Sequence, residues 1–251
     1  MFRIWGLALL FCAISVQASA ASKNILLTGY WSPSNDMLRR LSLNPVQNPE
    51  GWIGKNYKNS GYDVYAYFPE FLPGSGMVGA GDFRVDYASA FNDFMRYTWE
   101  LQPIAIVSFG VGKGPWEIEA MDLARFHQMF ESGNIPSDVG EKIHYSVPNS
   151  QRAPVDYRSS LPMELIRDKV NALGGPEAWI DHKKGAGDYL CSFIAYLGGW
   201  YHNEHGDPRD PAYNAMAGFI HINTSEQEGR RAVDATLEAI FETLSMSLYM
   251  D

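Results

Sequence analysis

The chain has 251 residues, of which 46% are hydrophobic and 20% are charged, and its formal net charge is −9 at pH 7. This length suffices for one domain with a sizeable core. The acidic balance argues against binding to nucleic acid and to anionic membrane surfaces.

The first twenty residues have the form of a secretory signal peptide. Arg3 supplies a positive start, residues 4–16 are almost wholly apolar, and Ala18-Ser19-Ala20 has the small-x-small pattern of a cleavage site. The apolar run is too short for a comfortable membrane span. We therefore expect a periplasmic or secreted protein, not held in the membrane after cleavage, whose residues 21–251 form a single domain.

The sequence of the first half of this domain predicts three strands and one helix. Residues 31–60, rich in Asn, Pro, Gly and Ser, predict a long loop. Residues 83–101 have helical spacing, and Pro103 ends that helix. Strands are predicted from short apolar or alternating segments at residues 24–29, 62–68 and 104–110.

The second half predicts alternating helices and strands. Strands are expected at residues 178–181 and 217–222. Helices are expected at residues 162–173, at 188–200 with Asp188 as the cap, and from about Gln227 onward. Strands that alternate with helices indicate a three-layer α/β domain with a mainly parallel sheet.

Cysteine and histidine chemistry is predicted at the edge of this sheet. Signal cleavage removes Cys12, so Cys191 is the one remaining cysteine and has no disulfide partner. Its place in the first turn of a helix favours the thiolate, whereas Asp188 opposes it. His221 falls at the carboxyl end of a strand, where sites collect, and is a candidate base for a Cys191 nucleophile.

Ordinary structural interpretations stand beside these hypotheses. Cys191 also fits a small buried hydrophobic residue, and His221 a surface or capping residue. Glu117 and Glu119, candidate orienting acids, also fit solvated carboxylates. His202 and the residues that follow it predict a polar loop before Pro208 rather than a metal site, so no metal is expected.

Several motifs occur in an order that resembles pyroglutamyl peptidase I, also called pyrrolidone-carboxylate peptidase. They are Thr28-Gly29-Tyr30, residues 135–140 (IPSDVG), residues 186–191 (AGDYLC), Gly218-Phe219-Ile220-His221 and Glu226-Gln227. The resemblance implies an α/β/α sandwich with a mainly parallel mixed sheet. It also implies a Cys-His-Glu triad that removes an N-terminal pyroglutamate without a cofactor.

The resemblance assigns roles to three residues. By position, Cys191 would be the nucleophile and His221 the general base. Glu119 would be the orienting acid, because Met121 and Leu123 then fall on apolar positions of the family. Glu117 remains the alternative.

The resemblance also indicates how substrate would be bound. Tyr30 and Trp31 stand where the family's first loop packs against the pyroglutamate ring, and Asn44 belongs to a matching Asn-Pro pair. Asn134 occupies the position of a family arginine and would be a neutral donor near the reacting carbonyl.

Three functional hypotheses follow from the sequence. The first is a cysteine peptidase of the pyroglutamyl peptidase type. The second keeps the triad but takes a different amide, because the first loop and Asn134 depart from the family. The third is an inactive binding protein on the same scaffold. A peptide or small amide is the expected partner, and a homo-oligomer is left open.

Overall fold

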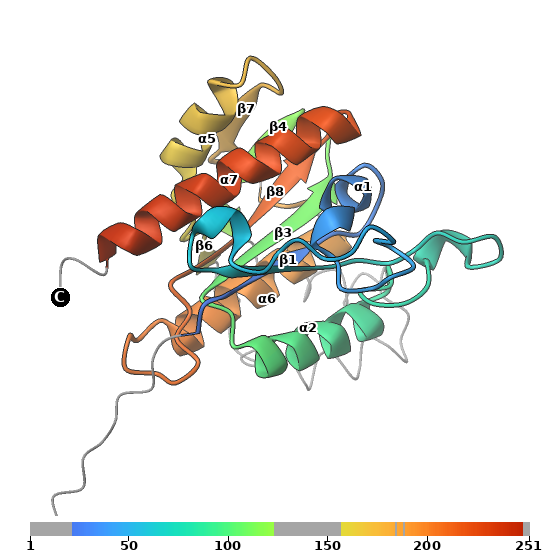
Figure 1. Cartoon of the computed structure of the whole chain (residues 1–251), viewed down its shortest axis with the longest axis horizontal. Coiled ribbons are helices and arrows are strands. Elements are labelled where there is room, and N and C mark those ends of the chain that lie inside the picture. The colour runs from blue at the N-terminus through green and yellow to red at the C-terminus, as the bar shows by residue number, and fades with distance from the viewer. Residues whose placement is uncertain (1–21, 123–156, 184, 188, 248–251) are drawn as a thin grey trace, which may run out of the picture.

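A six-stranded sheet crosses the middle of the molecule (Figure 1). The computed structural model describes residues 22–122, 157–183, 185–187 and 189–247. In sheet order the strands are β2 (Asp63–Tyr67), β1 (Asn24–Thr28), β3 (Ala105–Val111), β8 (Met216–Ile222), β4 (Trp116–Glu119) and β7 (Ala178–Asp181). Two further short strands, β5 (Met121–Asp122) and β6 (Tyr157–Arg158), form a separate antiparallel pair.

The sheet is mixed and mainly parallel, as predicted. Strands β2, β1, β3 and β8 pair in parallel. Strand β4 pairs antiparallel with β8 and parallel with β7, so β4 and β7 run against the other four. The carboxyl end of β8 therefore lies beside the amino end of β4, and this junction carries the candidate site.

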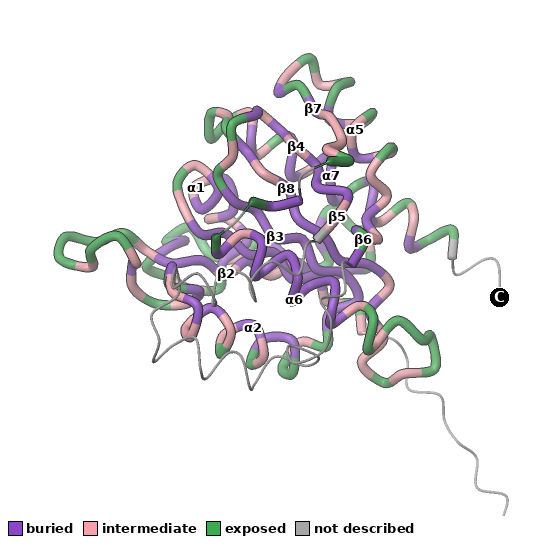
Figure 2. Tube along the Cα trace, turned by 180° about the vertical axis from the view of Figure 1, so that it is seen from behind, coloured by how far each residue is buried: buried purple, intermediate pink, exposed green. Residues whose placement is uncertain are grey.

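Helices cover both faces of the sheet. On one face lie α1 (Ser34–Leu38), α5 (Met163–Asn171) and α7 (Glu226–Ser247); on the other lie α2 (Tyr87–Leu101) and α6 (Leu190–His205). Burial is concentrated on the central strands and on α6, whereas the loops are mostly exposed (Figure 2). The three-layer prediction is confirmed. None of the described helices has the length and apolarity needed to cross a membrane.

Local sequence explains where two helices begin and pack. Helix α2 starts after Asp86, whose side chain accepts a hydrogen bond from the backbone N–H of Ser89. The helix begins four residues later than predicted, because Phe83 has a left-handed φ of 51° and cannot continue a helix. In α7, apolar residues at helical spacing are buried against the sheet: Val233, Leu237, Ile240 and Leu244.

The prediction of a long loop at residues 31–60 was wrong in part. The segment contains α1 and two 3₁₀ turns, η1 (Arg39–Leu41) and η2 (Tyr57–Asn59); a third, η3 (Gly76–Val78), lies farther along. Several polar side chains of residues 31–60 are buried, because they form hydrogen bonds with backbone carbonyl groups. Asn35 Nδ2 donates to the carbonyl of Pro69 at 2.9 Å, and Gln47 Nε2 donates to that of Phe68 at 2.7 Å.

Two other predictions also need correction. Helix α6 extends to His205, so the first four residues of the polar loop predicted at His202 are helical, because no Gly or Pro occurs between Trp200 and Gly206. Helix α6 begins at Leu190 with Tyr189 at the cap position, two residues after the predicted start at Asp188, which lies outside the described residues. Strand β4 was not predicted at all.

Candidate active site

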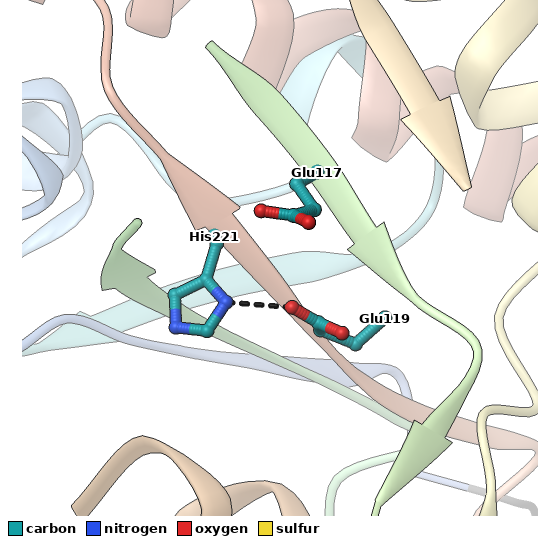
Figure 3. A group of neighbouring side chains, drawn as sticks. All are labelled: Glu117, Glu119 and His221. Atoms are coloured by element: carbon teal, nitrogen blue, oxygen red, sulfur yellow. Dashed lines mark hydrogen bonds and ion pairs between the residues drawn. The ribbon is translucent and has the colours of Figure 1, made fainter. Parts of the chain in front are cut away.

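Strand β4 carries two glutamates to the side of His221. Along Trp116–Glu119, Trp116 and Ile118 are fully buried, and Glu117 and Glu119 alternate with them. In the antiparallel pairing of β4 with β8, Glu117 lies opposite His221 and Glu119 lies opposite Phe219. Both carboxylates therefore come from one strand and face the imidazole (Figure 3).

Glu119 and His221 form a short, buried contact. His221 Nδ1 lies 2.6 Å from Glu119 Oε1, and the two side chains are 12% and 2% exposed. Glu119 Oε2 has no hydrogen-bond partner among the described residues. The contact directs Nδ1–H toward the carboxylate and leaves Nε2 pointing away from it (Figure 3). This is the orientation that a general base requires.

Cys191 reaches the same imidazole from helix α6. It is the second residue of that helix, so it lies in the first turn as predicted, and its side chain is partly exposed. The cap residue Tyr189 makes no side-chain capping bond, so the first backbone N–H groups of α6 are not used by that side chain. The Cys191 thiol is close enough to His221 to act on the pKa of the imidazole as a hydrogen-bond partner. The thiol, the imidazole and the Glu119 carboxylate thus form a continuous chain.

The charge state of His221 follows from these contacts. Burial alone lowers the pKa of the imidazole. Hydrogen bonds to Cys191 and Glu119, together with the negative charges of both residues, outweigh burial and raise the pKa of His221 to about 10. The arrangement therefore favours an imidazolium at His221, held between the sulfur of Cys191 and the carboxylate of Glu119.

A glycine-rich segment makes room for these side chains. A Cβ on Gly110 would lie 2.8 Å from Cys191 Sγ, and one on Gly112 would lie 2.6 Å from His221 Cβ. A Cβ on Gly114 would lie 1.7 Å from the ring of Trp179. These glycines are needed because sulfur, imidazole and indole each approach the backbone too closely for a side chain at these positions.

Glu117 adds a second carboxylate beside the imidazole. One ligand atom each from Glu117, Glu119 and His221 lie within 4.8 Å of one another, a grouping that could hold a metal ion. His221 Nδ1 and Glu119 Oε1 are, however, already engaged with each other. Burial and the charge of Glu119 raise the pKa of Glu117 against the opposing effect of His221.

An open cavity of about 640 Å³ adjoins His221. Its walls come from the glycine-rich segment, from β4 and β7, and from the loop before α6. The lining residues are Val111, Gly112, Lys113, Gly114, Glu117, Glu119, Trp179, Asp181, Gly185, Gly187 and His221. Asp181 was not singled out from the sequence, although its strand β7 pairs with β4.

Of the residues predicted to bind substrate, Tyr30 is buried in the core, whereas the neighbouring Trp31 is only partly buried. Tyr30 is 1% exposed, its hydroxyl donates to Thr28 Oγ1 at 3.3 Å, and its ring meets Phe83 edge-on. Trp31 is half-buried and stacks on Phe71 at 4.8 Å.

The other two predicted residues lie in a turn and in an undescribed segment. Asn44 Oδ1 accepts a hydrogen bond from the N–H of Val46 at 2.9 Å, which stabilises a turn. Asn134 lies outside the described residues.

Two histidines at the end of α6 have structural partners. His202 Nδ1 lies 3.0 Å from the carbonyl of Asn214, and His205 Nδ1 lies 3.0 Å from Asp210 Oδ2. In the described part of the chain these two histidines belong to no three-residue grouping of metal-binding side chains.

Comparison with known proteins agrees with the resemblance. No family model matches the chain. The pyrrolidone-carboxylate peptidase of Thermococcus litoralis is 25% identical over 175 residues, which are 68% of this chain and 71% of that protein.

The solved structures share the fold. A mutant pyrrolidone carboxyl peptidase from Pyrococcus furiosus matches with a TM-score of 0.60 at 20% identity, over 88% of this chain and 99% of that one. The Thermococcus litoralis enzyme matches with a TM-score of 0.56 at 16% identity, over 90% and 96%. The chain is thus a divergent relative of the pyrrolidone-carboxylate peptidases with the same α/β fold.

Proposed function

We propose that this protein is an exported cysteine peptidase that hydrolyses an N-terminal pyroglutamyl or closely related amide bond. The observation that carries the proposal is the chain of contacts from Cys191 through His221 to the buried Glu119, in which Nδ1 and Oε1 lie 2.6 Å apart. The relatives named pyrrolidone-carboxylate peptidase support the substrate class. The signal-like residues 1–20 support export.

The reaction proceeds through an acyl-enzyme. The Cys191 thiolate attacks the amide carbonyl, and the resulting C–S bond replaces the C–N bond as that bond breaks. His221 gives its Nε2 proton to the leaving amine, which departs neutral. Water then attacks the thioester while His221 takes one of its protons. The acid leaves, and the thiolate with its imidazolium is restored.

Two features supply the remaining stabilisation. Glu119 holds the imidazole in one orientation and balances the charge of the imidazolium. The backbone N–H groups at the start of α6 are donors for the oxyanion that forms during attack, because no capping side chain from Tyr189 occupies them. Asn134 is proposed as an additional neutral donor.

A chromogenic pyroglutamyl amide tests the proposal directly. The reduced wild-type protein should release the chromophore, and Cys191→Ala should reduce kcat by about 10³-fold or more. Glu119→Gln keeps the shape of the side chain and should reduce kcat by about 10²-fold or more, whereas Glu117→Gln should have a smaller effect. Equal activity of wild type and Cys191→Ala would remove Cys191 as the nucleophile.

The identity of the acyl group needs a second measurement. A panel of amides with pyroglutamyl, acetyl, prolyl and glutaminyl groups should show the highest kcat/KM for the pyroglutamyl amide. Another acyl group as the best substrate would keep the triad and change the specificity. Slow alkylation of Cys191 by iodoacetamide below pH 7, unchanged in His221→Ala, would instead contradict a peptidase.

A further inference from the structure

The cavity beside His221 lies on one side of the reacting groups. Among the described residues its lining includes His221 and Glu119 but neither Cys191 nor Tyr30. Gly112, which lines the cavity, abuts His221, whereas Gly110, which does not line it, is the glycine that abuts Cys191 Sγ. The cavity is therefore on the imidazole side of the reacting groups.

The reaction decides which part of a substrate enters this cavity. The acyl group stays on the sulfur of Cys191, whereas the leaving amine takes its proton from His221. The residue that follows the scissile bond therefore lies on the imidazole side. This step rests on the proposed function, because it assigns the cavity to the leaving group of that reaction.

The cavity presents negative charge that the site does not use. Glu119 is balanced by His221, but Glu117 on β4 and Asp181 on β7 are further carboxylates, both half-buried. Lys113 also lines the cavity but is exposed, so water screens its charge more strongly. Burial raises the pKa of Glu117, as do the charges of Glu119 and Asp181 and a hydrogen bond with Asp181, against the influence of His221.

A second observation also indicates that a ligand in this cavity would carry a hydrogen-bond donor or a positive charge. Glu119 is 2% exposed and lines the cavity, yet its Oε2 has no hydrogen-bond partner within the described ranges. The indole of Trp179, which fills the space over Gly114, offers an apolar wall for an aliphatic stem. An ammonium or guanidinium on such a stem would meet carboxylates at its end and an aromatic surface along its length.

We propose that Glu117 and Asp181 select a lysine or arginine directly after the scissile bond. Glu117 lies within β4, Asp181 is the last residue of the neighbouring strand β7, and both line the cavity that receives the leaving group. Glu117 and Asp181 are thus specificity-determining residues for the leaving group, separate from the triad.

Substrates that differ only after the scissile bond test this proposal. Pyroglutamyl-lysine, pyroglutamyl-methionine and pyroglutamyl-glutamate amides share one acyl group and differ in the charge of the next side chain. We expect kcat/KM for the lysine substrate to exceed that for the methionine substrate by about fivefold, and that for the glutamate substrate by more. Asp181→Asn should weaken this preference and leave kcat for the methionine substrate within about twofold, and the double variant Glu117→Gln with Asp181→Asn should remove the preference. The matched control is Glu177→Gln, an exposed glutamate just before β7 that does not line the cavity.

Binding of the free leaving group separates this proposal from the proposed function. Lysinamide and norleucinamide differ by one ammonium, and ligand-observed NMR in the presence of EDTA should show tighter binding of lysinamide to wild type than to the double variant. Hydrolysis without any charge preference would overturn the proposal and leave the peptidase standing. Selective binding of lysinamide by a protein that does not hydrolyse pyroglutamyl substrates would overturn the proposed peptidase and leave the charge selectivity of the cavity standing. Equal binding of both amides would also refute the proposed selectivity.

Discussion

A histidine–carboxylate pair lies near each end of helix α6. The two pairs contain the same kinds of group but differ in their separation and in their exposure to solvent. At the amino end, near Cys191, His221 Nδ1 contacts Glu119 at 2.6 Å, with side chains that are 12% and 2% exposed. At the carboxyl end, about 24 Å away along the axis, His205 Nδ1 contacts Asp210 at 3.0 Å, with side chains 30% and 27% exposed.

The difference shows that a histidine and a carboxylate do not make a site on their own. Water and ions screen the His205 pair, and a pair of that kind stabilises a protein little. The His221 pair is shielded by the sheet, and its second nitrogen is free to meet a thiol. Burial and a nearby thiol distinguish the candidate catalytic pair from the exposed one.

The largest expected effect comes from removing each histidine in turn. His221→Ala should lower kcat by about 10³-fold or more, because the base and proton donor is lost. His205→Ala should leave kcat within about twofold. Both are measured with the pyroglutamyl amide that wild type cleaves best.

Stability must be followed in parallel, because His221→Ala leaves Glu119 buried without its partner. The double variant with Glu119→Gln should recover stability in urea denaturation but not activity. Recovery of activity in the double variant, or equal losses in the two histidine variants, would contradict the comparison.

The next effect is a dependence of stability on pH that the buried pair should produce. The folded pKa of His221, about 10, lies above its ordinary value of 6.5, so the folded protein binds the proton more tightly. The stabilisation is fully present below pH 6.5 and is lost as pH rises toward 10, by up to a few kcal/mol. Urea denaturation of wild type and His221→Gln, kept reduced, should give a free-energy difference that shrinks over this range. A difference that stays constant would mean that His221 is not charged when folded.

A smaller effect tests the space beside His221. Gly112→Ala places a Cβ 2.6 Å from His221 Cβ and should destabilise the protein by about 1–3 kcal/mol and lower kcat. Gly198 lies within α6 with Ala217 Cβ at 3.7 Å, an ordinary contact. Gly198→Ala should therefore be neutral or stabilising by up to about 1 kcal/mol. Thermal unfolding and kcat are measured for both; a tolerated Gly112→Ala would show that His221 can shift without loss.

The smallest effect is expected at the exposed pair. Asp210→Asn keeps an oxygen that can accept from the N–H of Ala212 but removes the charge next to His205. We expect a loss of less than about 1 kcal/mol and no change in kcat, with the difference reduced further in high salt. A loss as large as that of Glu119→Gln would mean that exposure does not separate the two pairs.

Apolar periodicity predicted the frame of this fold well. The strands at β1, β3 and β8, the stripe of α7 and the position of Cys191 in the first turn of α6 all follow from patterns within single segments. Predictions of this kind need no knowledge of what lies across the sheet.

The missed elements depend on partners far away in the chain. Strand β4 has a four-residue alternation of apolar residues and glutamates, too short to stand out, and it forms because β8 and β7 supply hydrogen bonds on both sides. The segment at 31–60 has a loop-like composition, yet Asn35 and Gln47 are buried because they bond to carbonyls after β2. The resemblance favoured Glu119 over Glu117 as the orienting acid, whereas the contact between His221 Nδ1 and Glu119 Oε1 at 2.6 Å could be found only from the folded side chains.

The position of β8 sets when the thiol can become reactive. This strand is the last in the described chain, yet it lies inside the sheet between β3 and β4, so it must insert between segments synthesised before it. Contacts between such distant segments form late in folding. Until β8 is in place, Cys191 has no imidazole beside it, and a growing or partly folded chain carries an ordinary thiol. The His221 imidazole can therefore meet the thiol only in a chain that has been synthesised beyond β8.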